Sequence, residues 1–210
     1  MRTIKILFIS IFLFISLFAR PYSVPVGSSD NTISLTINNQ GFQDIQELHV
    51  VPENIPEFIE INQLDNSNSI KAGQTGIVKY SFTIKENAKI DSLIELKFNI
   101  TGDKSVNRQK IIPIRITAPE KFELYDNYPN PFNPVTNIKY TLPEKSKVNL
   151  SIYNLTGQRV QTLVQKSQEA GIYTQKWNAS NLASGVYFYR IKIQNSAGIK
   201  TETRKMLLVK

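Results

Sequence analysis

The only histidine in the 210-residue chain, His49, is the first candidate for catalytic chemistry. A hydrolase needs a carboxylate pair, or a nucleophile with a base beside it. Glu53, Glu57 and Glu60 follow His49 closely and could supply carboxylates. These glutamates stand after prolines in a stretch typical of a solvated turn, and His49 has no identifiable Ser and Asp partner. We therefore expect His49 to be an ordinary, partly buried histidine, with a small hydrolase as the alternative hypothesis.

Asp65 begins a polar stretch, Asp-Asn-Ser-Asn-Ser, whose oxygens could bind calcium. The stretch lacks the spacing and the terminal glutamate of an EF-hand, so a polar turn is the expectation. The chain has no cysteine, which excludes thiolate nucleophiles, disulfides and Cys-type zinc sites. The sequence therefore predicts no catalytic site, no metal and no cofactor.

Apolar and polar residues alternate with a period of two along most of the chain, which predicts half-buried β-strands. In the first half the runs lie at residues 33–37, 78–84, 94–100 and 112–116, with shorter candidates at 47–51 and 58–61. In the second half they lie at residues 138–142, 148–152, 160–164, 173–177, 186–193 and 199–209. About six or seven short strands in each half, with no convincing helix, predict an all-β chain of two tandem immunoglobulin-like β-sandwich domains. We place the boundary after Ala118, which gives domains of residues 20–118 and 119–210.

Residues 1–19 have the features of a secretory signal peptide. Arg2 and Lys5 precede an apolar stretch over residues 6–18, and the small Ala19 comes just before the polarity changes. The stretch is shorter than the ~20 apolar residues that a membrane-spanning helix needs. We expect export, with cleavage after Ala19.

The net charge of +8 is distributed unevenly. Residues 20–118 include 10 basic and 11 acidic residues, whereas residues 119–210 include 13 basic and 6 acidic residues, a charge of +7. Such a basic domain could bind nucleic acid, anionic lipid or anionic polysaccharide, or could simply present a soluble basic face. The basic residues form no run and no recognition helix, so we do not expect nucleic acid as a partner.

The least ordinary stretch is Tyr-Pro-Asn-Pro-Phe-Asn-Pro at residues 128–134. Its three prolines fix φ and remove backbone donors, so the stretch cannot be a central strand. Tyr128 and Phe132 are large aromatics that gain free energy by burial. A rigid segment with two aromatic anchors could close the open end of a sandwich, which we favour, or could be presented to a partner.

Further motifs follow in fixed order, and together they resemble the C-terminal sorting domain of the type IX secretion system, type A, over about residues 122–210. After residues 128–134 they lie at residues 136–143, 148–160, 171–177, 182–189 and 205–210. The motif residues are Tyr128, Pro129, Asn130, Pro131, Phe132, Asn133, Pro134, Tyr153, Gly157, Val160, Gly171, Tyr173, Trp177, Gly185, Tyr187, Lys205 and Lys210. The three glycines stand in turns between strands, where a positive φ is often needed, so we expect them to be structural.

The resemblance implies a route and a set of partners. Family members cross the inner membrane by the Sec translocon, fold in the periplasm, and pass through an outer-membrane translocon that recognises this domain. A sortase-like peptidase then commonly removes the domain and can join the new C-terminus to an anionic lipopolysaccharide. In this chain the processing region would be Ala118, Pro119, Glu120, Lys121 and Phe122. The implied location is the surface or the medium of a diderm bacterium.

If the second domain is an address, residues 20–118 are the passenger. Residues 35–41 and 70–84 faintly resemble exported bacterial domains of the conserved-repeat adhesion type, which are usually spacers or binding modules. We therefore expect a non-catalytic binding or structural protein. A small secreted hydrolase and a carbohydrate-binding accessory module, delivered by the same tail, are the alternatives.

Overall fold

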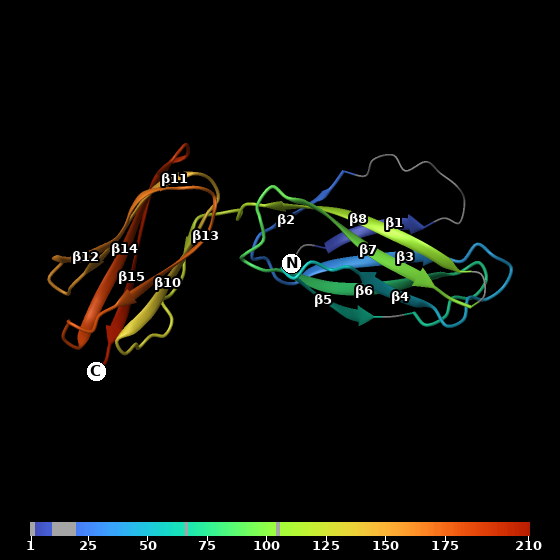
Figure 1. The fold of residues 1–210 in the computed structure, drawn as a ribbon, viewed down its shortest axis with the longest axis horizontal. Coiled ribbons are helices and arrows are strands. Elements are labelled where there is room, and N and C mark those ends of the chain that lie inside the picture. The colour runs from blue at the N-terminus through green and yellow to red at the C-terminus, as the bar shows by residue number, and fades with distance from the viewer. Residues whose placement is uncertain (1–2, 10–19, 66, 104–105) are drawn as a thin grey trace. The chain divides into compact units, whose positions relative to one another are not determined.

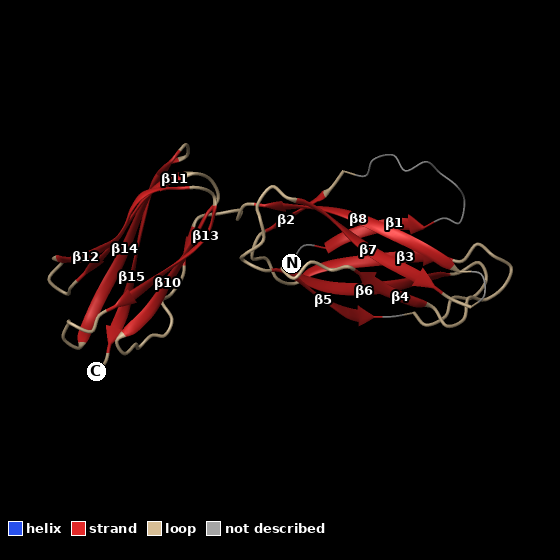
Figure 2. Ribbon diagram, in the orientation of Figure 1, coloured by secondary structure: helices blue, strands red, loops and turns tan. Residues whose placement is uncertain are grey.

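The computed structural model describes residues 3–9, 20–65, 67–103 and 106–210, which form strands and loops (Figures 1 and 2). In these ranges no helix has the length and apolar character to cross a membrane. The chain divides into two compact units, Met1–Thr117 and Ala118–Lys210. The division falls one residue before the boundary expected from the sequence. The expected all-β fold with tandem sandwiches is confirmed.

The first unit is built from two four-stranded sheets, with the strand orders β1-β3-β6-β5 and β2-β8-β7-β4. The strands are β1 (Thr3–Ile9), β2 (Tyr22–Pro25), β3 (Asn31–Asn38), β4 (His49–Glu53), β5 (Ile59–Asp65), β6 (Thr75–Ile84), β7 (Leu93–Thr101) and β8 (Asn107–Thr117). Tyr80 of β6 and Phe98 of β7 meet between the sheets, with ring centroids 5.1 Å apart. The Tyr80 hydroxyl also donates a hydrogen bond to the Val50 carbonyl of β4, so a polar contact joins the two sheets inside the core.

Strand β1 lies at the edge of its sheet, where it pairs in parallel with β3. It falls within the segment that the sequence predicts to be a removable signal peptide, and that removal stays a prediction. The rest of the segment, residues 1–2 and 10–19, lies outside the described residues. Without β1, the edge strand of this sheet would be β3.

The second unit pairs a three-stranded sheet, β13-β10-β9, with a four-stranded sheet, β12-β11-β14-β15. The strands are β9 (Glu123–Leu124), β10 (Val135–Leu142), β11 (Ser146–Tyr153), β12 (Arg159–Gln168), β13 (Gly171–Asn178), β14 (Gly185–Asn195) and β15 (Gly198–Leu208). Neighbouring strands are antiparallel throughout both sheets, and β11 lies between β12 and β14.

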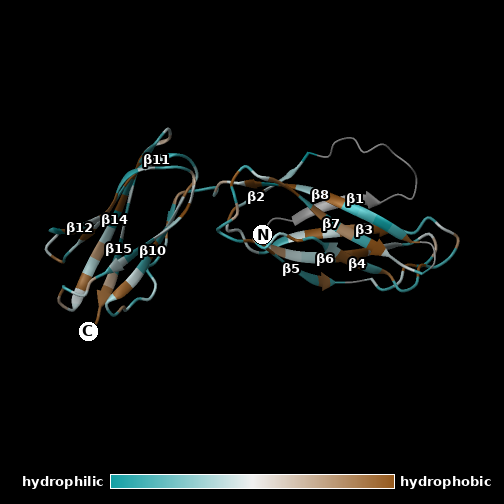
Figure 3. Cartoon of the chain, in the orientation of Figure 1, coloured by the Kyte–Doolittle hydropathy of each residue, from teal (hydrophilic) through white to brown (hydrophobic). Residues whose placement is uncertain are grey.

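Alternating side chains explain why these residues form strands. On β14, Tyr189, Ile191 and Ile193 are fully buried, whereas Arg190 and Lys192 between them are exposed. A strand turns successive side chains to opposite faces, so one face packs and the other meets solvent. Figure 3 shows this alternation of hydropathy along the strands.

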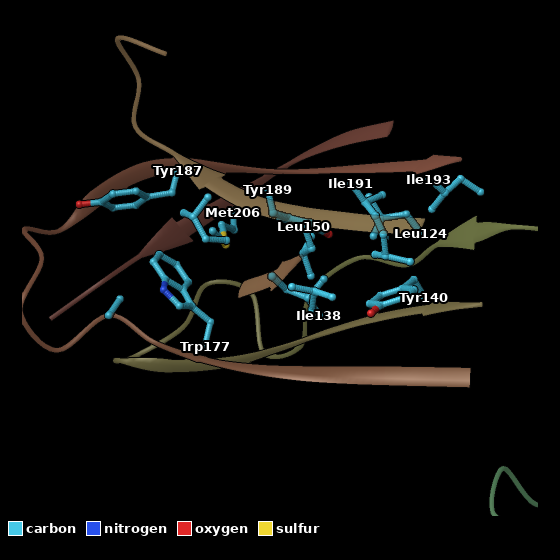
Figure 4. Packing of buried hydrophobic residues seen from close by; sticks show 14 of the residues in the cluster. Leu124, Ile138, Tyr140, Leu150, Trp177, Tyr187, Tyr189, Ile191, Ile193 and Met206 are labelled. Carbon is cyan, nitrogen blue, oxygen red and sulfur yellow. The ribbon is translucent and has the colours of Figure 1, made fainter. Parts of the chain in front are cut away.

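The core of the second unit fills the space between its two sheets (Figure 4). Trp177 of β13 and Tyr187 of β14 contact each other across that space, with ring centroids 5.7 Å apart. The Tyr140 hydroxyl donates to the Gln168 side chain at 2.8 Å, and the Tyr189 hydroxyl donates to the Tyr125 carbonyl at 2.8 Å. Burial raises the pKa of Tyr140 and of Tyr189 to about 12 each, because a buried phenolate would lose its hydration.

Candidate functional site

The loop over residues 128–134 inserts one of its two aromatic side chains into the core of the second unit. Phe132 is 2% exposed, and its ring lies against Trp177 with centroids 5.4 Å apart. Burying a phenylalanine contributes roughly 1.5–3 kcal/mol, and a contact between aromatic rings adds to this. The expectation that this segment closes one end of the sandwich agrees with the burial of Phe132.

The backbone of the same loop binds the last strand. The Phe132 amide donates to the Leu207 carbonyl at 2.9 Å, and the Val209 amide donates to the Phe132 carbonyl at 3.0 Å. The Leu207 amide in turn donates to the Asn130 side chain at 3.0 Å. The loop therefore acts as a clip, and we call residues 128–134 the clip below. Proline can occupy three of its seven positions because the clip donates through Tyr128 and Phe132, which keep their N–H groups.

Two buried polar residues that flank the clip hold it in shape. Asn127 and Thr136 are 3% and 0% exposed. The Asn127 amide donates to the Thr136 hydroxyl at 2.9 Å and to the Pro129 carbonyl at 3.0 Å, and the Thr136 hydroxyl donates to the same carbonyl at 2.8 Å. Buried polar groups need such partners, so the pair fixes the path of the chain. Asn127 was not singled out from the sequence, and Thr136 was included only as the first residue of the motif at residues 136–143, although their positions at the two ends of a proline-rich loop are a usable signal.

Tyr128 does not act as a second anchor. Its side chain is 80% exposed, although its backbone pairs with Asn137 in both directions at 2.9–3.0 Å. The expectation that both aromatics serve as anchors is therefore wrong for Tyr128, because the backbone pairing with β10 turns its ring to solvent. Pro129, Asn130, Pro131 and Asn133 are also exposed. The clip thus has one buried aromatic, Phe132. Its exposed side chains are those of residues 128–131 and 133, and we call them the exposed ridge.

Most of the other motif residues build the sandwich. Trp177 is 1% exposed and donates from its indole nitrogen to the Gln161 side chain at 3.0 Å. Tyr187 is 8% exposed and donates to the Ala183 carbonyl at 2.8 Å. Val160 and Tyr173 are partly buried against the same core. Tyr153 differs, because it points to the outer face of its sheet, where the Arg190 guanidinium lies 4.7 Å from the centre of its ring.

Gly157 supplies a backbone conformation that the β11–β12 hairpin requires. Its φ is +80°, and its amide donates to the Asn154 carbonyl at 3.1 Å. A β-carbon there would meet no atom within 4 Å, so the requirement is one of backbone conformation and not of space. Gly171 and Gly185 also have positive φ values, +156° and +155°, a backbone conformation that residues with a side chain rarely adopt.

The two motif lysines lie on or after β15 and differ in their contacts. Lys205 is exposed on the outer face of β15. Lys210 donates from its side chain to the Ser180 carbonyl at 2.6 Å, and its amide donates to the Ser184 hydroxyl at 3.1 Å. The end of the chain is therefore tied to the loop between β13 and β14.

Residues 126–207 match the model of the family described as the secretion system C-terminal sorting domain. The second unit is a sorting domain of the type IX secretion system. A sorting domain of this kind directs the protein that bears it to secretion, so this chain is a secreted protein. No curated protein matches the chain.

Solved structures show weaker likenesses that span both units. One is a crystal structure of dimeric latent PorU from Porphyromonas gingivalis, with 16% identity and a TM-score of 0.36, covering 96% of this chain and 20% of that one. Another is the CupB2 chaperone of Pseudomonas aeruginosa, with 10% identity and a TM-score of 0.33, covering 90% of this chain and 98% of that one.

The expected processing region is the connection that enters the sorting domain. Residues 118–122 form no strand, and β9 begins at Glu123. Glu120 and Lys121 are exposed, whereas Phe122 is 8% exposed and belongs to the core of the sorting domain. Pro119 is buried, so the residues that a peptidase could reach while the sorting domain stays folded are Glu120 and Lys121.

The candidate catalytic residues of the first unit have separate surroundings. His49 is exposed on β4, so the expectation of a partly buried histidine is wrong. Its neighbour Val50 is 3% exposed, and because side chains alternate along a strand, His49 must face solvent. Glu53 accepts hydrogen bonds from the Asn99 and Gln109 side chains at 3.0 and 3.1 Å.

The other two glutamates do not join this group in the described contacts. Glu57 is exposed, and Glu60 forms an ion pair with Lys85 at 3.0 Å. Within the described part of the chain, no three His, Asp or Glu side chains are placed to hold a metal ion. In the stretch from Asp65 to Ser69, residue 66 lies outside the described residues, and the Ser67 hydroxyl donates to the Ile77 carbonyl at 3.1 Å.

Proposed function

We propose that this chain is a small, non-catalytic binding or structural protein that the type IX outer-membrane translocon carries to the cell surface or the medium. The first unit is the passenger, and the sorting domain is the address. The observation that supports this most strongly is the difference in burial within the clip. Phe132 is buried in the core, and five of the seven side chains stay exposed. Stability alone does not require an 80% exposed tyrosine.

The exposed ridge of the clip is the proposed contact surface for the export machinery. Tyr128 heads the ridge, and the prolines beside it hold the backbone in a fixed shape. A rigid segment loses little conformational entropy when it binds, and exposed tyrosines are enriched at the centres of protein interfaces. The translocon is thus proposed to recognise a preformed surface and not a flexible tail.

A sortase-like peptidase is the proposed second partner, acting within residues 118–121. The exposure of Glu120 and Lys121 and the absence of strand pairing there favour cleavage at this point. Cleavage beyond Phe122 would require the edge of the sorting-domain core to open, since Leu124 is 0% exposed and β9 pairs with β10. Attachment of the new C-terminus to an anionic lipopolysaccharide belongs to the same proposal.

The passenger is proposed to bind its ligand without catalysis, and one loop favours a binding role. Phe42 is fully exposed at the tip of the loop after β3. Asn39, 2% exposed, braces this loop by donating to the Gln43 and Ile70 carbonyls at 2.8 and 3.0 Å. The Gly41 amide donates back to the Asn39 side chain at 3.0 Å. A braced loop that presents a large apolar side chain is a common form of contact site.

The proposal is tested by the export of variants in the native host. Deleting residues 122–210 should trap the passenger in the periplasm. Tyr128→Ala should lower severalfold the amount of protein found at the cell surface and in the medium. Chains that retain the sorting domain should accumulate in the periplasm. Quantitative immunoblotting of cell fractions with antibody to the passenger measures both effects.

Phe42→Ala is the matched control, because it also removes one exposed aromatic side chain but leaves the clip intact. It should leave export unchanged. Normal surface display of the truncated chain would overturn the address role. Normal export of Tyr128→Ala would overturn the assignment of the ridge as the contact surface.

A further inference from the structure

One face of the sorting domain is almost free of acidic residues. The four strands β12, β11, β14 and β15 include a single acid, Glu202. Glu202 is paired in register with the buried Ile191, so it points toward the opposite face of the sheet. The outer face presents five cations, which are Lys147, Arg159, Arg190, Lys192 and Lys205. We call this surface the basic face.

A shallow depression of about 410 Å³ lies on the basic face, where β12, β11 and β14 run side by side. Lys147 and Lys192 line it from the basic face, together with side-chain amides such as those of Asn149 and Gln165. Lys166 is also a lining residue, but it is paired in register with the buried Val148, so its side chain points toward the opposite face of the sheet. No carboxylate is among its lining residues. In the part of the chain that the structure describes, none of these three lysines is in an ion pair. The depression therefore combines unneutralised positive charge with groups that can both donate and accept hydrogen bonds.

Arg190 is held in place next to this depression. Its guanidinium lies over the Tyr153 ring at 4.7 Å, and its Nε donates to the Thr203 hydroxyl at 3.3 Å. Lys192 follows two residues later on the same face, at a spacing of about 7 Å along the strand. Stacking on an aromatic ring restricts the arginine and leaves its outer N–H groups available for an anion. The two residues thus form a row of fixed cations that leads into the depression.

We propose that the basic face binds an acidic polysaccharide, with one carboxylate- or phosphate-bearing sugar in the depression and the next acidic sugar at Arg190. The polar lining favours a glycan, because amides and lysines match sugar hydroxyls and acid groups. An acidic protein would be expected to meet an apolar or aromatic anchor pocket at the centre of the site, and the depression has only Val148 as an apolar lining residue. A single-stranded nucleic acid would need aromatic rings on which bases stack, and none lines the depression.

This proposal goes beyond the export function, and its test does not depend on export. The purified full chain is titrated calorimetrically with a hexamer of galacturonate, and in parallel with the fully methyl-esterified hexamer. Binding of the acidic hexamer without binding of the neutral one is expected. A response to both, or to neither, would overturn the proposal.

Charge-removing variants locate the binding site. The double variant Lys147→Gln, Lys192→Gln should weaken the binding of the galacturonate hexamer at least tenfold. Lys176→Gln, which removes an exposed lysine from β13 in the other sheet, should change the affinity less than twofold. Equal losses in all lysine variants would mean attraction by net charge alone, which contradicts a built site.

A membrane surface is the competing target for a basic face. Vesicles of phosphatidylglycerol and phosphatidylcholine should bind more weakly than the hexamer, and the double variant should not alter that binding selectively. Vesicle binding that is stronger than hexamer binding, and that is lost in the double variant, would reassign the face to anionic lipid. Trp177 fluorescence, which reports on the core, should be unchanged in every variant.

Discussion

Replacing Phe132 by alanine should destabilise the sorting domain by about 3–4 kcal/mol. The ring is 2% exposed and packs against Trp177, and truncating a buried phenylalanine costs roughly 3–5 kcal/mol. The lower part of that range is expected because the hydrogen bonds from the clip to Leu207 and Val209 use backbone atoms, which alanine retains. Only the side-chain contribution is lost.

Urea unfolding followed by tryptophan fluorescence measures this change directly. The chain has one tryptophan, Trp177, and it is the residue that Phe132 contacts. With a denaturant slope of about 1–3 kcal/mol per molar urea, the midpoint should fall by roughly 1–4 M. The signal therefore reports on the sorting domain even though the passenger is present.

Tyr128→Ala is the matched control for this measurement. Its side chain is 80% exposed, so the stability should change by less than about 0.5 kcal/mol. The reasoning would be refuted if Phe132→Ala cost under 1 kcal/mol, or if both substitutions cost the same. Either result would mean that the clip is not divided into a core residue and an exposed ridge.

Three further changes test separate parts of the sorting domain. Gly157→Val should cost on the order of 1–2 kcal/mol, because φ is +80° and a branched residue is strained there; an equal urea midpoint for variant and parent would contradict this. Thr136→Val keeps the shape but removes a hydroxyl with two buried hydrogen bonds, which should lower the free energy of unfolding by about 1–3 kcal/mol in the same titration. Stability should also fall at alkaline pH: the folded pKa values of Tyr140 and Tyr189, about 12, lie above the unfolded value near 10, so their contribution is complete below pH 10 and is lost as the pH rises through 12. Urea midpoints that stay constant from pH 9 to 12 would disprove the last expectation.

Strands long enough to show alternating apolar residues could be predicted from the sequence, and the shortest strands could not. Runs such as Ile33, Leu35 and Ile37 have enough members to show the period of two, and they form β3. Strand β9 has only two residues, and β2 has four with a proline at its end, so neither shows a pattern. Their pairing is decided by neighbouring strands, which a local reading of the sequence does not include.

The candidate site shows the same limit at the level of single side chains. Tyr128 and Phe132 both stand before or after prolines, and nothing in their types says which one is buried. Backbone pairing of Tyr128 with Asn137 decides the matter, and that contact is not local in sequence. For His49 the information was present, because its two neighbours in the sequence, Leu48 and Val50, are apolar and buried. The alternation of side chains along a strand is enough to place His49 in solvent.

The position of β15 has a consequence for the order of events during export. This strand is the last one, it forms the edge of the four-stranded sheet, and the clip closes on Leu207 and Val209. A copy whose synthesis stops before Gly198 has no strand for the clip to hold, so Phe132 loses its backbone partners and the ridge loses its support. A translocon that recognises only the closed clip would therefore pass full-length copies and reject prematurely terminated ones. The sorting domain would then also select for complete translation of the chain.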